Sequence, residues 1–386
     1  MMTTISIRPF TVSVPDEVLE DLRTRLRRTV WPRTIRDGGW RYGTDRDYMA
    51  RLRDHWLERY DWRATEARIN RFENVIASVD GYDIHVIRER GSGRNPLPLI
   101  LSHGWPGSVV EFLDLIDALA HPEKHGGNPD DGFDVIVPSL PGYGWSSPPA
   151  EPITTRDMAR LWQRLMVDGL GYRRYVAQGG DWGSLIASWL GLDYPDHVKA
   201  IHINMMGLRP YTGPDSAPIT AEEEAWLKFA RRRLHWEDAY QRVQGTKPAT
   251  LAFGLSDSPI GLAAWIIEKF YGWSVRDGQE PPFDMDRLID NVMVYWTTNS
   301  IASSVWLYTA ARHVGGMGLG QGEWIGTPTG FLSFPNDLFP PPPDAWVARV
   351  YNCVHRRDLP EGGHFAAMER GQDLVEDVRT FFAAYR

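Results

Sequence analysis

The residues with the clearest capacity for chemistry lie in the segment Gln178-Gly179-Gly180-Asp181-Trp182-Gly183-Ser184. A short apolar run precedes the segment at residues 175–177 and a second follows at 185–190, which predicts a strand, a tight turn and a helix. Glycines on both sides of Asp181 would let strand and helix approach closely while the turn exposes the central carboxylate. An aspartate at such an apex can attack carbon and form an ester. The pattern also fits an ordinary turn residue or a helix N-cap, so alone it leaves both interpretations open.

Three further segments place reactive groups directly after predicted strands. They are His103-Gly104-Trp105-Pro106-Gly107-Ser108, Phe334-Pro335-Asn336-Asp337 and Gly362-Gly363-His364-Phe365. A histidine oriented by an acid can activate water, and paired backbone amides can stabilise an oxyanion. The chain order Asp181, Asp337, His364 is that of the catalytic triad in α/β-hydrolases. Each segment alone fits an ordinary loop, but together and in this order they indicate one catalytic site.

The oxyanion donors can be assigned from the same pattern. In α/β-hydrolases one amide belongs to the residue after the nucleophile, and the other comes from the loop after an earlier strand. These positions correspond to the backbone N–H groups of Trp182 and Trp105. We therefore expect both amides to face the carboxyl carbon of Asp181.

The rest of the chain must supply the elements that position these groups. A helical N-terminal belt is predicted for residues 1–72, with one helix opening at Pro15 and another after a capping box of Thr44 and Asp47. Alternating strands and helices over residues 73–206, resuming over 325–386, predict an α/β class with a mostly parallel sheet. Residues 207–324 are predicted to form a helical lid. The predicted strands are 74–79, 84–88, 98–101, 133–137, 175–178, 198–204, 330–334 and 347–354. The predicted helices of the sheet and lid are 109–120, 221–236, 238–243, 259–270, 285–312 and 373–385.

Composition excludes several classes of function. Of 386 residues, 42% are hydrophobic, which predicts a well-filled globular core. The net charge of −8 argues against nucleic-acid binding. The basic runs 23–28 and 231–233 lie among apolar positions at helical spacing, which indicates solvated helix faces. A single cysteine excludes an internal disulfide, and the polar start of the chain predicts neither a signal peptide nor a membrane anchor. We therefore expect a cytoplasmic protein. Zinc-protease, paired-cysteine and phosphate-loop motifs are absent, so no metal or organic cofactor is expected.

In these motifs the chain resembles α/β-hydrolase-fold epoxide hydrolases of the microsomal type, including their soluble bacterial and fungal relatives. The resemblance covers nearly the whole chain. Besides the segments around Trp105, Asp181 and His364, it rests on Thr246-Lys247-Pro248 and on Asp257-Ser258-Pro259-Ile260-Gly261-Leu262. It implies conversion of an epoxide to a vicinal diol through a hydroxyalkyl ester of aspartate, which a histidine-activated water then hydrolyses.

The resemblance also implies a role for each matching residue. The nucleophile falls on Asp181, the base on His364 and the acid on Asp337, where some relatives carry glutamate. Two lid tyrosines that hold the epoxide oxygen fall on Tyr240 and Tyr308.

The same resemblance leads to expectations for the pocket and the partners. We expect His103, Pro106 and Trp145 to line the substrate pocket, and Trp145 to reshape one wall because relatives commonly carry phenylalanine there. The expected partner is a small-molecule epoxide, with aromatic epoxides among the candidates, and a homodimer is among the expected assemblies. Bacterial relatives act in detoxification or in natural-product pathways, and the sequence leaves that choice open.

Two alternatives stay open at this point. A haloalkane dehalogenase would use the same aspartate, histidine and acid, and such enzymes often have tryptophan after the nucleophile, as at Trp182. It would have no need of two lid tyrosines. The second alternative is a ligand-binding relative that has lost hydrolysis, against which the intact set of catalytic residues argues.

Overall fold

The computed structural model describes residues 5–35, 38–275, 278 and 280–386. Residues 1–4 and 36–37 of the predicted belt, and 276, 277 and 279 of the predicted lid, lie outside the described residues. Division of the chain at residues 72, 206 and 324 stays a prediction.

One sheet organises the described part of the chain, with strand order β1-β2-β3-β5-β4-β6-β7-β8-β9. The strands are β1 (Ser6–Pro9), β2 (Glu73–Val79), β3 (Tyr82–Glu89), β4 (Leu97–Ser102), β5 (Phe133–Pro138), β6 (Tyr175–Gly179), β7 (Val198–Ile203), β8 (Ile325–Ser333) and β9 (Tyr351–Asp358). From β5 to β9 each neighbouring pair is parallel, whereas the pairs that join β1, β2, β3 and β5 are antiparallel. This confirms the predicted α/β class with a mostly parallel sheet.

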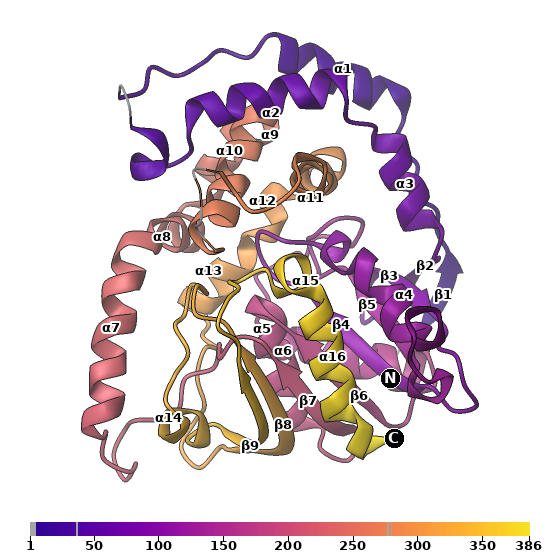
Figure 1. Ribbon diagram of the computed structural model, residues 1–386, viewed down its shortest axis with the longest axis vertical. Coiled ribbons are helices and arrows are strands. Elements are labelled where there is room, and N and C mark those ends of the chain that lie inside the picture. The colour runs from indigo at the N-terminus through magenta and orange to yellow at the C-terminus, as the bar shows by residue number, and fades with distance from the viewer. Residues whose placement is uncertain (1–4, 36–37, 276–277, 279) are drawn as a thin grey trace.

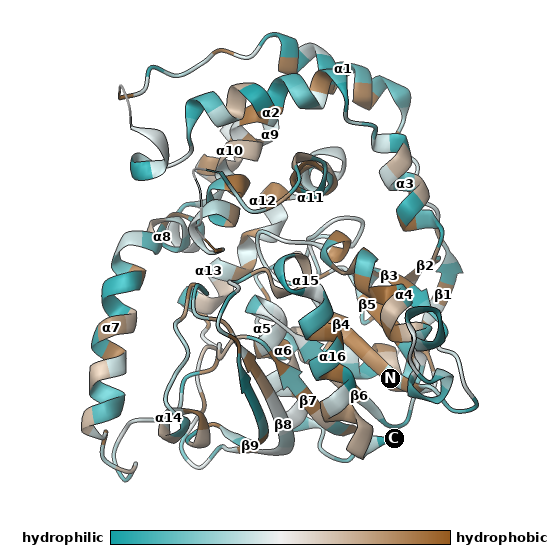
Figure 2. Ribbon diagram, in the orientation of Figure 1, coloured by the Kyte–Doolittle hydropathy of each residue, from teal (hydrophilic) through white to brown (hydrophobic). Residues whose placement is uncertain are grey.

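Helices cover both faces of the sheet, which explains why its central strands are mostly apolar. The helices of this part are α4 (Leu113–Ala120), α5 (Thr155–Arg164), α6 (Asp181–Asp193), α14 (Asp344–Ala348), α15 (Ala366–Glu369) and α16 (Gly371–Phe382). Helices α4 and α16 pack together on one side, and α5 packs against α6 on the other (Figure 1). Figure 2 shows the contrast between the hydrophobic central strand β4 and the hydrophilic edge strand β9.

The N-terminal helices form an arch over the helices inserted between β7 and β8 (Figure 1). They are α1 (Asp16–Arg27), α2 (Arg46–Glu58) and α3 (Trp62–Asn70). Two expectations here were wrong. Residues 6–9 form a strand that pairs with β2, so this segment is not helical throughout. The N-cap of α2 is Asp45, whose carboxylate accepts from the Tyr48 amide, while the Thr44 hydroxyl donates to the Ala264 carbonyl.

The insertion between β7 and β8 is helical, as predicted. It contains α7 (Ala221–Glu237), α8 (Ala239–Thr246), α9 (Pro248–Asp257), α10 (Pro259–Gly272), α11 (Met285–Thr298), α12 (Ile301–Ser304) and α13 (Trp306–His313). The single helix predicted for 285–312 was wrong, because Asn299 adopts a left-handed conformation (φ 49°) that ends α11. Helix α9 was not predicted. The strand expected at 347–354 begins only at Tyr351, because residues 344–348 are helical.

The helices of the described residues include no single one that is both long and apolar enough to cross a membrane. Helices α9 and α10 meet these criteria only when taken together, and they are bent by 118° at their junction.

Candidate active site

Asp181 lies at the turn between β6 and α6, as the first residue of the helix. Its φ of 47° is a left-handed value, uncommon for a residue with a side chain and frequent at functional turns. The flanking glycines are required sterically. A Cβ atom on Gly183 would collide with the Ser102 carbonyl, and one on Gly179 would collide with the backbone of Gly183. The close approach of strand and helix predicted from the sequence is therefore confirmed.

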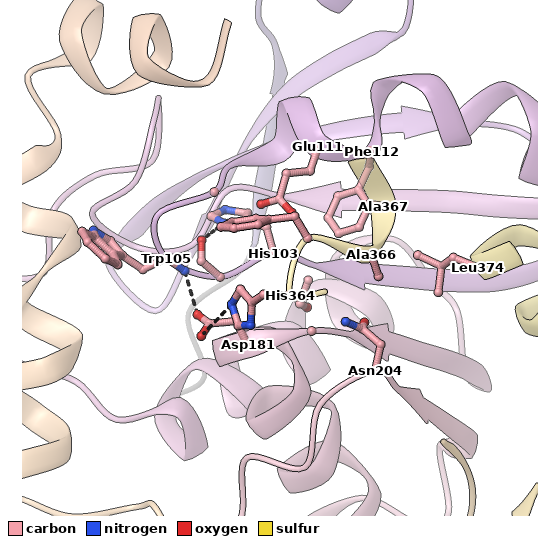
Figure 3. Close-up of a pocket in the computed structure, with 15 residues that line it drawn as sticks. His103, Trp105, Glu111, Phe112, Asp181, Asn204, His364, Ala366, Ala367 and Leu374 are labelled. Carbon is pink, nitrogen blue, oxygen red and sulfur yellow. Dashed lines mark hydrogen bonds and ion pairs between the residues drawn. The ribbon is translucent and has the colours of Figure 1, made fainter. Parts of the chain in front are cut away.

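The Asp181 carboxylate is held from two sides (Figure 3). Its Oδ1 atom accepts a hydrogen bond of 2.8 Å from the backbone N–H of Trp105. Its Oδ2 atom lies 3.4 Å from Nε2 of His364. A side chain on Gly104 would collide with this carboxylate, so position 104 also requires glycine. Two of the predicted segments thus meet at one carboxylate.

His364 lies between two carboxylates in the interior. Its Nδ1 atom is 2.7 Å from Oδ1 of Asp337, and both side chains are almost fully buried. Burial alone would lower the pKa of His364, but the charges and hydrogen bonds of Asp337 and Asp181 outweigh it and raise the pKa to about 10. The backbone N–H of His364 donates to the Trp273 carbonyl at 2.8 Å, which fixes the loop that carries the ring.

The two tyrosines named from the sequence come from different helices, α8 and α13, yet lie together. The ring centroids of Tyr240 and Tyr308 are 5.6 Å apart, and Trp105 stacks on Tyr240 while meeting Tyr308 edge-on. Burial and the nearby Asp181 charge raise the pKa of the Tyr240 phenol far above its ordinary value. Burial likewise raises the pKa of Tyr308. Both phenols therefore stay protonated near neutral pH and can donate a proton.

A cavity of about 40 Å³ lies between Asp181 and these tyrosines. Besides Asp181 and the two tyrosines, its polar lining residues are Arg209 and Gln241, and the rest of the lining is apolar or glycine. Its lining consists of Asp181, Trp182, Leu185, Met205, Gly207, Arg209, Tyr240, Gln241, Tyr308, Met317, Leu338 and Phe339. The Trp182 ring packs edge-on against Tyr308, with 4.8 Å between centroids. We refer to this space as the tyrosine cavity.

A second cavity of about 20 Å³ meets Asp181 and is lined by His364, His103, Glu111 and Asn204, among others. We refer to it as the histidine cavity. Burial lowers the pKa of His103 to about 4, so its ring is neutral and its Nε2 atom can accept from the Leu140 amide at 3.1 Å. His103 thus lines a cavity at Asp181, but not the one that contains the tyrosines.

Two expected pocket residues lie elsewhere. Trp145 packs against His85 and Phe10, with ring centroids 5.0 and 6.4 Å away, and lines neither cavity. The expectation that Trp145 shapes the pocket wall is therefore corrected. Pro106 also lines neither cavity, and its carbonyl accepts from the Asn291 amide at 2.7 Å. The prediction failed because a residue's place in a loop motif does not fix the direction of its side chain.

The residues that hold the loop 103–108, which we call the Trp105 loop, were not predicted from the sequence. On α11, Asn291 accepts from the Ser108 hydroxyl at 2.8 Å as well as donating to Pro106, and the Tyr295 hydroxyl donates to the Gly107 carbonyl at 2.6 Å. Both lie on the buried face of a predicted helix, and polar residues in such positions were a signal that could have indicated them. Glu111, a buried acid within the helix predicted for residues 109–120, offered the same signal and was also not predicted.

Comparison with known proteins identifies the relatives of the chain. A family model described as "Epoxide hydrolase N terminus" matches residues 7–112, and one described as "alpha/beta hydrolase fold" matches 98–256. The chain is 34% identical over 415 residues to "Epoxide hydrolase 1" of Oryctolagus cuniculus, covering 97% of this chain and 88% of that protein. The structure of Aspergillus niger epoxide hydrolase is similar with a TM-score of 0.84 and 35% identity, covering 98% of this chain and 96% of that one. The juvenile hormone epoxide hydrolase of Bombyx mori gives a TM-score of 0.85 at 28% identity, covering 100% and 96%.

Proposed function

Because the chain belongs to the epoxide hydrolase family and is an enzyme that acts on epoxides, we propose that it forms its diol product through a covalent ester of Asp181. The observation that carries this proposal is the environment of one carboxylate. A backbone amide holds Oδ1, a buried histidine faces Oδ2, and two protonated phenols lie across a shared cavity.

In the first step, Oδ2 of Asp181 attacks one carbon of the epoxide. The carbon–oxygen bond of the three-membered ring breaks, and the released oxygen takes a proton from Tyr240 or Tyr308. An alkoxide is a poor leaving group at neutral pH, so a donor at this oxygen is required. The raised pKa values of both phenols support this role, because each keeps its proton until the oxygen becomes strongly basic.

In the second step, water adds to Cγ of Asp181 and gives a proton to His364. The negative charge that develops on Oδ1 is stabilised by the Trp105 amide, already 2.8 Å away, and by the amide of Trp182. Collapse breaks the bond between Cγ and the diol oxygen, which takes the proton from His364. Asp181 then loses the remaining proton to the phenolate of the tyrosine that donated in the first step, so that Asp181 is a carboxylate and the tyrosine a neutral phenol again.

Esterification itself prepares His364 for this second step. In the free enzyme, Asp181 and Asp337 together raise the pKa of His364 to about 10. The ester carries no charge, so one of the two carboxylates that favour the protonated ring is removed. The pKa of His364 must then fall, and the ring becomes available as a base.

One observation favours the dehalogenase alternative. The indole N–H of Trp182, which lines the tyrosine cavity, is buried and makes no hydrogen bond within the described residues, as expected of a halide-binding donor. A turnover assay that offers an aryl epoxide and a haloalkane of similar size separates the two activities. We expect diol formation to dominate, and dominant halide release would favour the dehalogenase.

A further inference from the structure

The two cavities at Asp181 differ in their chemistry. They share Asp181 and no other residue. The tyrosine cavity contains donors for the epoxide oxygen, whereas the histidine cavity contains the base that acts on water. A volume of about 20 Å³ exceeds the roughly 10–15 Å³ that one water molecule needs, and polar groups converge on it. The histidine cavity therefore has the size and lining of a site for a single water molecule.

Glu111 is the acid that lines the histidine cavity besides Asp181. It lies in a short 3-10 turn, Val109–Phe112, directly after the Trp105 loop, and its side chain is buried. Its carboxyl lies against Gly107, where a Cβ atom would collide with Oε1. In Figure 3, the Glu111 side chain extends from this turn toward the region occupied by His103, Asp181 and His364.

The charge state of Glu111 suits contact with a neutral ligand. Burial raises its pKa to about 8, against the opposing effect of His364, so the carboxyl is neutral near pH 7. The nearby cation Arg287 is engaged with Asp114, at 3.1 Å. The Ser108 backbone is one hydrogen-bond partner of the carboxyl. A protonated carboxyl retains further acceptor capacity on its carbonyl oxygen.

We propose that the histidine cavity holds the water that hydrolyses the Asp181 ester, and that Glu111 accepts one hydrogen bond from this water while His364 accepts the other. The inference rests on the covalent function proposed above. With both hydrogens directed to these acceptors, a lone pair of the water oxygen faces Cγ of Asp181. The oxygen bonds to Cγ, one proton passes to His364, and the other stays on the new carboxyl group until it is lost as Asp181 ionises. Glu111 orients the water and undergoes no net change.

Two substitutions test the role of the Glu111 acceptor. Glu111→Gln keeps a carbonyl oxygen at the same position, whereas Glu111→Met keeps the length and removes the acceptor. Each variant is mixed in excess with an aryl epoxide in a rapid single turnover, and ester formation and ester decay are followed separately by quenching and intact mass. Thermal unfolding of each variant measures whether the fold is kept.

We expect Glu111→Met to form the ester at the wild-type rate and to hydrolyse it on the order of 100-fold more slowly, the loss typical of a misplaced reactant. Glu111→Gln should recover most of the hydrolysis rate. A purely structural role would instead slow both steps and would not separate them. Decay of the ester at the wild-type rate in folded Glu111→Met would show that the role of Glu111 is wrong while the covalent route stands. If neither the wild type nor the folded Glu111 variants ever gain the mass of the substrate, the covalent route is wrong and the role of Glu111 is wrong with it.

Discussion

Nε2 of His364 lies 3.4 Å from Oδ2 of Asp181, while Nδ1 of the same ring lies 2.7 Å from Asp337. Charge-assisted hydrogen bonds between nitrogen and oxygen are typically about 2.7–2.9 Å long, so the ring is tightly bound to Asp337 and only loosely to Asp181. The looser contact leaves Oδ2 available for attack on carbon. It also couples the charge of Asp181 to the proton on His364.

This coupling predicts the pH dependence of the second step. Hydrolysis needs a neutral His364, so the rate of ester decay should rise with pH through the pKa of the ring in the ester. That midpoint should lie below the value of about 10 that both carboxylates together produce in the free enzyme. Single-turnover decay of the ester at a series of pH values gives the midpoint. A rate independent of pH, or a midpoint at or above pH 10, would contradict the coupling.

Removal of the base should separate the two steps. His364→Gln cannot accept a proton from water, so ester decay should slow by roughly 10²–10⁴-fold, the usual contribution of general base catalysis. The attack by Asp181 does not require the ring, so one equivalent of alkylated enzyme should accumulate and be visible by intact mass. A folded variant that neither turns over nor gains mass would show that the assigned roles are wrong.

The tyrosine pair should act on the first step. Tyr240→Phe and Tyr308→Phe should each slow alkylation, and the double variant should slow it by roughly 10²–10³-fold, because either phenol can partly replace the other. Decay of a preformed ester should change little. Tyr175→Phe serves as the matched control, since it removes a buried hydroxyl that donates to Gln163 outside both cavities. Stopped-flow alkylation at the wild-type rate in the double variant would refute the role.

Much of the site could be predicted because its signals are local. A strand, a glycine-flanked turn and a helix fix the place of Asp181, and the same logic of strand ends applies to Asp337 and His364. The local sequence alone did not identify Tyr240 and Tyr308 as site residues. Their helical surroundings are compatible with ordinary packing, and their joint place in the tyrosine cavity depends on how α8 and α13 fold over the sheet.

The residues that were wrongly assigned or not predicted have their positions set by long-range contacts. Trp145 was assigned to the pocket from the family resemblance, but its ring packs against Phe10 near the start of the chain. Asn291 and Glu111 are polar residues on apolar faces, and their partners are distant loop carbonyls or a cavity that only the fold creates. Periodicity identifies the face of a helix and does not identify what lies opposite.

Because Glu111 is buried in its protonated form, the free energy of unfolding should depend on pH. The pKa of Glu111 is near 4.5 in the unfolded chain and about 8 in the folded protein, so the folded state binds more protons between these pH values. The contribution of Glu111 to the free energy of unfolding therefore falls as pH rises through that window. Each pKa unit corresponds to about 1.4 kcal/mol. Glu111→Gln cannot ionise, so its unfolding temperature should exceed that of the wild type at pH 8, with the difference shrinking toward pH 4.5. Equal pH profiles by calorimetry would contradict the neutral state.

The most direct measurement of the covalent route follows the oxygen atoms of a single turnover in water enriched in heavy oxygen. Attack by Asp181 transfers a carboxylate oxygen to the substrate, so the first diol released by wild-type enzyme should contain light oxygen, and the enzyme should gain heavy oxygen at Asp181. Asp181→Asn should form no ester as long as the asparagine has not deamidated to aspartate, and its circular dichroism should match that of the wild type. Heavy oxygen in the diol from the first turnover, with none incorporated at Asp181, would show that water attacks the epoxide directly and would contradict the account.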